Sequence, residues 1–266
     1  MEWSEGVFLI DKPAGMTSFA VVRRVRRLLG IKKVGHAGTL DPFATGLMII
    51  CAGRAATRCI EQFMAGRKTY VAQLQLGVET TTQDPEGEVV GEYDVPELNQ
   101  ELITSCLRAH TGPQLQAPPP FSAAKHKGKP LYAYARRGVM IKKEAKPIEI
   151  HALQFRGYDP VNKQLAVEVS CSRGTYVRVL AADLGKALGC GAHLIGLRRT
   201  ESGPFQVGQC LCGTELFGDD GLQRLCESRH SITEILTCLG QTSVYPCLGE
   251  RPSGIEVTNR SPVSTL

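Results

Sequence analysis

One carboxylate in this sequence stands in a segment unlike an ordinary helix or strand. Residues 35–42 read Gly-His-Ala-Gly-Thr-Leu-Asp-Pro, so Asp41 follows two glycines and directly precedes Pro42. Glycine lets a backbone adopt positive φ or approach a ligand closely, and the proline restricts Asp41 to an extended or turn conformation. A carboxylate held on such a loop can act as a nucleophile or stabilise a developing positive charge. The alternative is a plain Asp-Pro turn or a helix cap.

Two further side chains are candidates for the same chemistry. Tyr70 opens a segment of alternating polarity, and Arg178 ends the run Gly-Thr-Tyr-Val-Arg. The residues alone favour Tyr70 as a core aromatic, whereas Arg178 is equally a surface charge. No dinucleotide fingerprint, phosphate loop or His-Glu-x-x-His motif occurs, and Cys210 and Cys212 are poorly spaced for zinc without further ligands. We therefore expect no cofactor and no metal.

The elements that must position these residues alternate between helical and strand periodicity. Strands are predicted over residues 7–10, 69–76, 148–155 and 165–172, and helices over 17–30, 55–64, 97–109 and 176–188. In the first helix the valines lie on one face and the arginines on the other. In the third, Leu98, Leu102, Cys106 and Leu107 are predicted to face inward. Because no βαβ repeat is visible, we predict an α+β fold with a mixed, largely antiparallel sheet flanked by helices and loops.

Charge is segregated along the chain although the net charge is only +5. Residues 23–33 and 125–146 are strongly basic, whereas residues 79–101 carry only acids. Such segregation suits a polyanionic partner, or it reflects ordinary solvated faces. Residues 112–147 contain Pro118–Pro120 and few core-forming residues, which is typical of an excursion over bound RNA or of a disordered surface loop.

Length and composition favour a globular protein. The 266 residues are 42% hydrophobic, enough for one large domain or a domain with a small appendage. No signal peptide and no membrane-spanning apolar run is evident, so we expect a cytoplasmic protein with reduced thiols.

Six motifs stand in a fixed order along the sequence. They are residues 9–13 with Gly15 and Ser18, residues 35–46, residues 68–70, residues 118–137, residues 171–178, and residues 197–200 with Ser202 and Gly203. In this order they resemble the TruB family of tRNA pseudouridine-55 synthases, over about three quarters of the chain. The resemblance implies the pseudouridine synthase fold, with a basic insertion at about residues 122–146 that clamps an RNA stem-loop.

The resemblance also implies how uridine becomes pseudouridine. Asp41 corresponds to the catalytic aspartate, which we assign as nucleophile, and Arg178 to the arginine that pairs with it and keeps its pKa low. Tyr70 corresponds to the residue that stacks on the target base and moves a proton. Tyr176 lines the pocket. The target base must leave its stem-loop to reach Asp41.

Four other positions correspond to binding or supporting residues of the family. Lys12 meets a phosphate or braces the loop. His36 contacts or fills space near the flipped nucleotides. Asp84 supports the site, although Thr81 stands where the family motif has another acid. Leu197 lines the apolar pocket or is an ordinary core leucine.

The resemblance fades after about Leu211. We expect a catalytic domain of residues 1–210 and a short C-terminal extension of residues 211–266 that is not a complete PUA domain, with a mobile, turn-rich end from Arg251. The implied partner is the T stem-loop of tRNA, with no membrane, no obligate protein partner and a monomeric state. Guide-RNA-dependent relatives, an RNA-binding or RNA-folding protein without turnover, and an enzyme acting on another ribosyl compound are the alternatives.

Overall fold

A single mixed sheet organises the molecule in the computed structural model, which describes residues 5–240. Its main path runs β14-β1-β3-β12-β4-β11-β10-β7. These strands are β14 (Leu211–Cys212), β1 (Gly6–Lys12), β3 (Thr45–Ala52), β12 (Ala192–Ser202), β4 (Lys68–Leu76), β11 (Gln164–Cys171), β10 (Lys146–Asp159) and β7 (Gly112–Gln116). Among the described strands, only the β1–β14 and β3–β12 pairs are parallel. The predicted α+β fold with a largely antiparallel sheet is confirmed.

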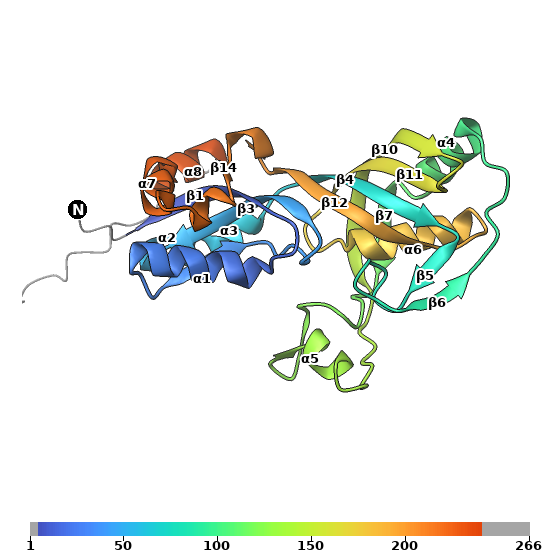
Figure 1. Ribbon diagram of the computed structural model, residues 1–266, viewed down its shortest axis with the longest axis horizontal. Coiled ribbons are helices and arrows are strands. Elements are labelled where there is room, and N and C mark those ends of the chain that lie inside the picture. The colour runs from blue at the N-terminus through green and yellow to red at the C-terminus, as the bar shows by residue number, and fades with distance from the viewer. Residues whose placement is uncertain (1–4, 241–266) are drawn as a thin grey trace, which may run out of the picture.

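The sheet extends through two halves that meet where β12 changes partners (Figure 1). β12 pairs with β4 along most of its length, and with β3 only at Arg198–Thr45 and Arg199–Gly46. The N-terminal half also contains β2 (Val34–Ala37), paired with β3, and helices α1 (Ser18–Leu29), α2 (Arg54–Arg58) and α3 (Ile60–Met64). The other half carries α4 (Gln100–Ala109) and α6 (Val177–Ala187) against the sheet, with the hairpin β5 (Val78–Thr80)–β6 (Val89–Glu92) beside it.

The first predicted helix forms for the reasons visible in its sequence. Thr17 caps α1 by accepting the Ala20 N–H at 3.1 Å, and Gly30 ends it in the left-handed region with φ of 65°. Its buried valines pack on one face of the sheet. The opposite face is not purely solvated, because Arg24 donates to the Leu216 carbonyl and Arg26 donates to the Val34 carbonyl.

Two other helices differ from their predictions. Helix α4 begins later than expected because Asn99 caps it by accepting the Leu102 N–H at 2.9 Å. Leu102 therefore lies in the first turn and is 53% exposed, and Ile103 is buried in its place, so the inward assignment of Leu102 was wrong. The helix predicted over residues 55–64 is two short helices, α2 and α3, separated at Cys59.

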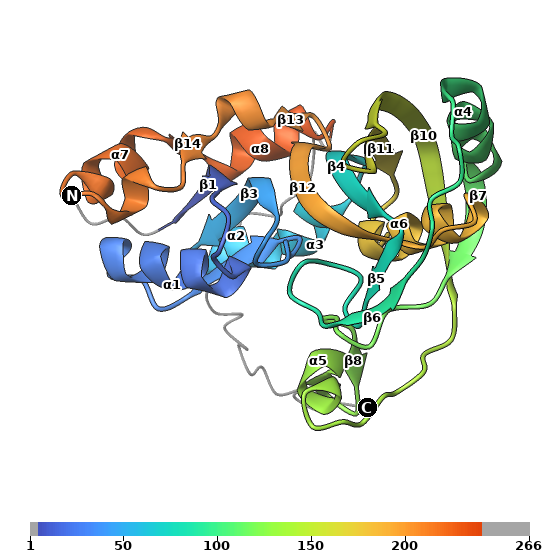
Figure 2. The same ribbon diagram turned by 45° about the vertical axis from the view of Figure 1, so that its right-hand side comes forward.

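The basic insertion is an ordered excursion. It contains the hairpin β8 (Lys125–His126)–β9 (Lys129–Pro130) and helix α5 (Leu131–Ala135), which stand away from the sheet (Figure 2). Leu131 and Ala135 are buried, and the Tyr134 hydroxyl donates to the His126 carbonyl at 3.1 Å. These contacts give the insertion a small interior of its own.

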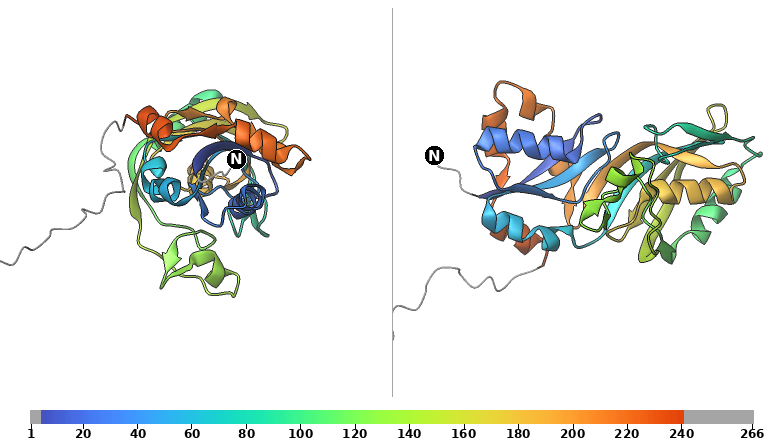
Figure 3. Two further views of the ribbon diagram at one scale, coloured as in Figure 1. Left: turned by 90° about the vertical axis from the view of Figure 1, so that its left-hand side faces the viewer. Right: turned by 90° about the horizontal axis from the view of Figure 1, so that it is seen from below.

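The chain after β12 returns to the N-terminal half (Figure 3). It forms β13 (Phe205–Gln206), β14, α7 (Gly221–Glu227), β15 (Arg229–His230) and α8 (Ile232–Cys238). β14 and β15 both pair with β1, and Ile235 of α8 packs with Val7 and Leu9. The turn-rich end predicted from Arg251 lies outside the described residues. Within residues 5–240, every helix is too short or too polar to cross a membrane.

A substitution at Gly46 tests how closely the backbones of β3 and β12 must approach at their junction. Its φ is +106°, and a Cβ there would lie 2.3 Å from the Arg199 carbonyl oxygen. We expect Gly46→Ala to lower the free energy of unfolding by at least about 2 kcal/mol, through backbone strain and the clash. Urea unfolding with an unchanged m-value measures this. Gly157→Ala is the matched control, because its Cβ would meet nothing within 4 Å; equal losses in the two variants would contradict the account.

Candidate active site

A cavity of about 350 Å³ opens where the two halves of the sheet meet. The loop after β2 brings Asp41 to it, the start of β4 brings Tyr70, and β12 brings Leu197 and Arg199. The N-terminal end of α6 contributes Arg178, and the first residues of the insertion close one side. Segments distant in the sequence therefore converge on one site.

Arg178 links two carboxylates. Its Nε lies 2.9 Å from Asp41 Oδ2, and its Nη1 lies 3.2 Å from Asp84 Oδ2. The two carboxylates differ in exposure: the side chain of Asp84, like that of Arg178, is 4% exposed, whereas that of Asp41 is 34% exposed. Asp41 is thus the member of this trio that a ligand in the cavity can reach.

The guanidinium is held by backbone as well as by carboxylates. Arg178 Nη1 donates to the Thr82 carbonyl at 2.7 Å, and Nη2 donates to the Phe121 carbonyl at 2.8 Å. Asp84 in turn accepts the Glu86 N–H at 3.0 Å and the Thr82 hydroxyl. Because each end of the guanidinium has a fixed partner, the direction from which it meets Asp41 is set by the fold.

The electrostatics differ from the expectation that a cation keeps the Asp41 pKa low. Burial raises the pKa of Asp41 above its ordinary value of 3.8, and the Asp84 charge raises it further. Arg178 and Lys12 act in the opposite direction. The cations therefore limit a rise in pKa that burial causes.

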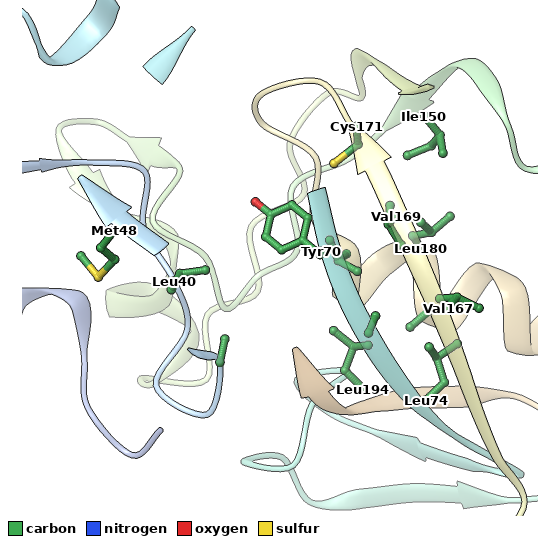
Figure 4. Packing of buried hydrophobic residues seen from close by; sticks show 14 of the residues in the cluster. Leu40, Met48, Tyr70, Leu74, Ile150, Val167, Val169, Cys171, Leu180 and Leu194 are labelled. Carbon is green, nitrogen blue, oxygen red and sulfur yellow. The ribbon is translucent and has the colours of Figure 1, made fainter. Parts of the chain in front are cut away.

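Tyr70 lies at the start of β4 with its ring directed from the strand toward the half that carries Leu40 (Figure 4). It borders the core on one side and the cavity on the other. Burial raises the pKa of the Tyr70 hydroxyl, while the charge of Arg199 and a hydrogen bond from it lower that pKa. The hydroxyl is therefore protonated at neutral pH.

Lys12 is fully buried next to the loop that carries Asp41 and Pro42. Its Nζ donates to the carbonyls of Pro13 at 2.8 Å, Met16 at 2.6 Å and Pro42 at 3.0 Å. These contacts use all three ammonium N–H groups, which agrees with bracing the loop and leaves no donor for a phosphate. Burial lowers the pKa of Lys12 to about 8, against the attraction of Asp41 and Glu86.

Of the three remaining predicted site residues, the structure places two at the cavity and one away from its lining. Tyr176 and Leu197 line the cavity. Tyr176 also occupies the N-cap position of α6, where its carbonyl accepts the Leu180 N–H at 3.2 Å and its own N–H donates to Gln116 Oε1 at 2.7 Å. His36 on β2 is absent from the cavity lining, and its buried Nδ1 has no hydrogen-bond partner among the described residues. No three metal-ligating side chains of His, Cys, Asp or Glu gather anywhere in residues 5–240.

Two buried cations at the cavity had no assigned role in the sequence analysis. Arg199 is 2% exposed, and it donates to the Leu47 carbonyl at 2.7 Å and to the Gly38 carbonyl at 3.1 Å. Lys68 is 6% exposed and donates to the Gly66 carbonyl at 2.8 Å, and burial lowers its pKa to about 8. Arg199 belongs to the motif at residues 197–200. Only its long-range contacts show that it joins Gly38, in the loop before Asp41, to Tyr70.

The trio of charges predicts opposite effects of two substitutions on the pKa of Asp41. Arg178→Gln should raise that pKa, because an attracting cation is lost while burial and Asp84 remain. Asp84→Asn should lower it, because the repelling carboxylate is lost. Carbon-13 NMR titration of the Asp41 carboxyl group measures both shifts, with Arg156→Gln at the exposed Glu168 pair as control. Shifts of the same sign in the two variants would contradict this arrangement.

Comparisons with known proteins find family profiles and relatives that match this chain. The profile of the N-terminal domain of TruB family pseudouridylate synthases matches residues 26–177, and that of the tRNA pseudouridylate synthase B C-terminal domain matches residues 178–216. The tRNA pseudouridine synthase B of Desulfotalea psychrophila is 51% identical over 88% of this chain and 96% of its own length. That of Haemophilus influenzae is 45% identical over 80% of this chain and 67% of its own.

A solved structure shows the same architecture. A chain in the crystal structure of a Cbf5-Nop10-Gar1 complex superposes with a TM-score of 0.65 at 25% identity, and the match covers 88% of this chain. This chain spans 62% of the length of that one. With both family profiles matched in order and relatives at this level of identity, the chain belongs to the TruB family of pseudouridylate synthases.

Proposed function

We propose that this chain converts the uridine at position 55 in the T-arm of tRNA to pseudouridine, with Asp41 as nucleophile. The observation that carries the proposal is the partly exposed Asp41 carboxylate, held 2.9 Å from a buried guanidinium at a cavity bordered by Tyr70. The relatives named tRNA pseudouridine synthase B support tRNA as the substrate.

The reaction needs a site of this kind. The bond between ribose C1′ and uracil N1 breaks, the base turns, and C1′ bonds to C5. The C5 proton is lost and N1 gains a proton, so product and substrate are isomers and no electrons are exchanged. Asp41 in its ionised form attacks the nucleotide or stabilises the positive charge left on the ribose. No cofactor is required for these steps.

The other cavity residues take supporting roles in this proposal. Tyr70 stacks on the extruded base, and its protonated hydroxyl gives and takes the migrating proton as a relay. Tyr176 and Leu197 provide apolar walls that exclude water. Arg178 holds Asp41 at one angle, Asp84 holds Arg178, and Lys12 braces the loop from below. His36 serves the flanking flipped nucleotides and takes no part in bond breaking.

The insertion is suited to hold the stem-loop over the cavity. Its lysines and arginines are mostly exposed, and none of them forms an ion pair with a described residue. Its first residues, Ser122 to Ala124, line the cavity itself. An RNA loop bound by this basic segment would therefore present its bases to Asp41.

Several finer features belong to the same proposal. The protein acts in the cytoplasm as a monomer, without an obligate protein partner or a membrane. Residues 1–210 form the catalytic domain, and a C-terminal extension begins at residue 211. The described part of that extension adds β14 and β15 beside β1, which supports a role in completing the sheet.

Asp41→Asn tests the proposed chemistry. We expect pseudouridine formation in a T-arm stem-loop to fall below detection, because an amide cannot attack or offset charge, while affinity for the RNA changes by less than about threefold. Mass spectrometry of the product RNA and a binding titration measure the two effects. Asp94→Asn, at an exposed position, is the control. Turnover by Asp41→Asn would exclude Asp41 as nucleophile, and a wild-type chain inactive on tRNA alone would favour a guide-dependent or non-catalytic RNA-binding protein.

Removing charges from the insertion tests the clamp. The triple variant Lys125→Gln, Lys129→Gln, Lys142→Gln should bind the T-arm stem-loop more weakly. The slope of log K against log salt should become shallower by about 0.7–0.9 for each phosphate that is no longer neutralised. Removing three exposed charges elsewhere, in Arg108→Gln, Lys163→Gln, Lys186→Gln, is the matched control. An unchanged salt slope in the insertion variant would show that the segment does not meet phosphates.

A further inference from the structure

We propose that a second basic surface, at the outer end of the N-terminal half, binds phosphates of the tRNA beyond the T-arm stem-loop. We define this outer basic cluster as Lys32, Lys33, Arg54 and Arg58, which surround a hollow of about 520 Å³ together with Thr57. The inference rests on the proposed function, because it assumes that tRNA is the substrate.

The four cations of the outer basic cluster are exposed and form no ion pairs with the described residues. All four side chains belong to exposed residues, and none forms an ion pair with a residue in the range 5–240. The neighbouring arginines of α1 behave differently, since Arg24 and Arg26 donate to backbone carbonyls. Four like charges gathered without counter-ions repel one another, and a bound polyanion relieves that repulsion.

The acidic groups near the cluster do not neutralise it. Glu5 lies beside the start of α2, and its Oε1 accepts the Ala55 N–H at 3.0 Å. Glu61, further along in α3, lies 3.5 Å from Arg173. Within residues 5–240, one engaged carboxylate beside four cations leaves the hollow positive.

The cluster and the catalytic cavity lie at opposite ends of the same elements. Lys33 directly precedes β2 and belongs to the outer basic cluster. Gly38 directly follows β2 and lines the cavity. Likewise Arg54 begins α2 at the cluster, and Met64 ends α3 at the cavity. The two five-residue helices together rise by roughly 15 Å, so one extruded nucleotide cannot reach both sites.

The arrangement of the molecule allows one RNA to reach both sites. Helix α1 and the α2–α3 pair run from the outer end of this half toward its middle (Figure 1), and the insertion projects to the side of them (Figure 3). An RNA held by the insertion over the cavity therefore continues alongside the N-terminal half. The phosphate backbone is the part of RNA that lysine and arginine bind without sequence preference.

The test compares full-length tRNA with an isolated T-arm stem-loop. The cluster variant Lys33→Gln, Arg54→Gln, Arg58→Gln removes three charges, as does the control Arg108→Gln, Lys163→Gln, Lys186→Gln. We expect the cluster variant to bind full-length tRNA about tenfold more weakly, with the salt slope shallower by about two to three. Its affinity for the stem-loop, and turnover on the stem-loop, should match those of the wild type and the control.

Each other outcome overturns the proposal. Equal weakening on both RNAs would place the cluster within the binding site of the arm, and an unchanged affinity for tRNA would remove any role in RNA binding. Saturable binding of inorganic phosphate that the variant loses, without an effect on tRNA, would identify a small-anion site instead. Turnover of the stem-loop by the wild type tests the proposed function separately, so failure of one is distinguishable from failure of the other.

Discussion

The site depends on one buried guanidinium that two carboxylates share. Arg178 meets Asp41 at 2.9 Å and Asp84 at 3.2 Å, and it also donates to the backbone carbonyls of Thr82 and Phe121. A buried charge is tolerated only when it is paired and hydrogen-bonded, so the turn at residues 82–84 and the start of the insertion must both be in place for Arg178 to stay where it is. The contact with Arg178 then helps to fix the position of the loop that carries Asp41. Burial is the main cause that raises the pKa of Asp41, and the Asp84 charge adds to the rise, while Arg178 and Lys12 act in the opposite direction.

The constraint also explains how the two halves cooperate. The sheet continues from one half to the other through β12, whose residue Arg199 donates to Leu47 of β3 and to Gly38 of the loop. Lys12 of β1 braces the Asp41 loop through the Pro42 carbonyl and holds the turn after β1 through the carbonyls of Pro13 and Met16. The N-terminal half therefore supplies Asp41, the proposed nucleophile, together with Lys12, while the other half supplies Arg178 and Tyr70. In our proposal, an RNA reaches the cavity between them while the insertion and the outer basic cluster bind its phosphates.

Local sequence signals predicted the elements that carry their own periodicity or caps. Helix α1 and strands β1 and β4 are confirmed within two residues at each end, because a cap and a glycine bound α1, an Asp-Lys-Pro turn follows the apolar run of β1, and a polar alternation marks β4. Strand β3 had no such mark. Its Met48 and Ile50 enter one hydrophobic cluster and its Leu47 and Ile49 the other, so both faces are buried and the sequence shows an apolar run without a period.

The residues around Asp41 could be predicted only in part. The loop motif and the order of the other motifs indicated Asp41, Tyr70 and Arg178, and the structure brings these three together at one cavity. The role of Arg199 lies in contacts to residues about 150 positions away, which no local pattern reveals. The sign of the pKa shift of Asp41 depends on burial and on Asp84 as well as on Arg178, so it required the three-dimensional arrangement.

The most direct measurement is a structure of this protein bound to a T-arm stem-loop. The account predicts that the target uridine is turned out of the loop into the cavity, with Tyr70 stacked on its base and an Asp41 carboxylate oxygen about 3–3.5 Å from the reacting nucleotide. A uridine that stays stacked in its loop, or one that meets a different side chain with Asp41 turned away, would contradict it.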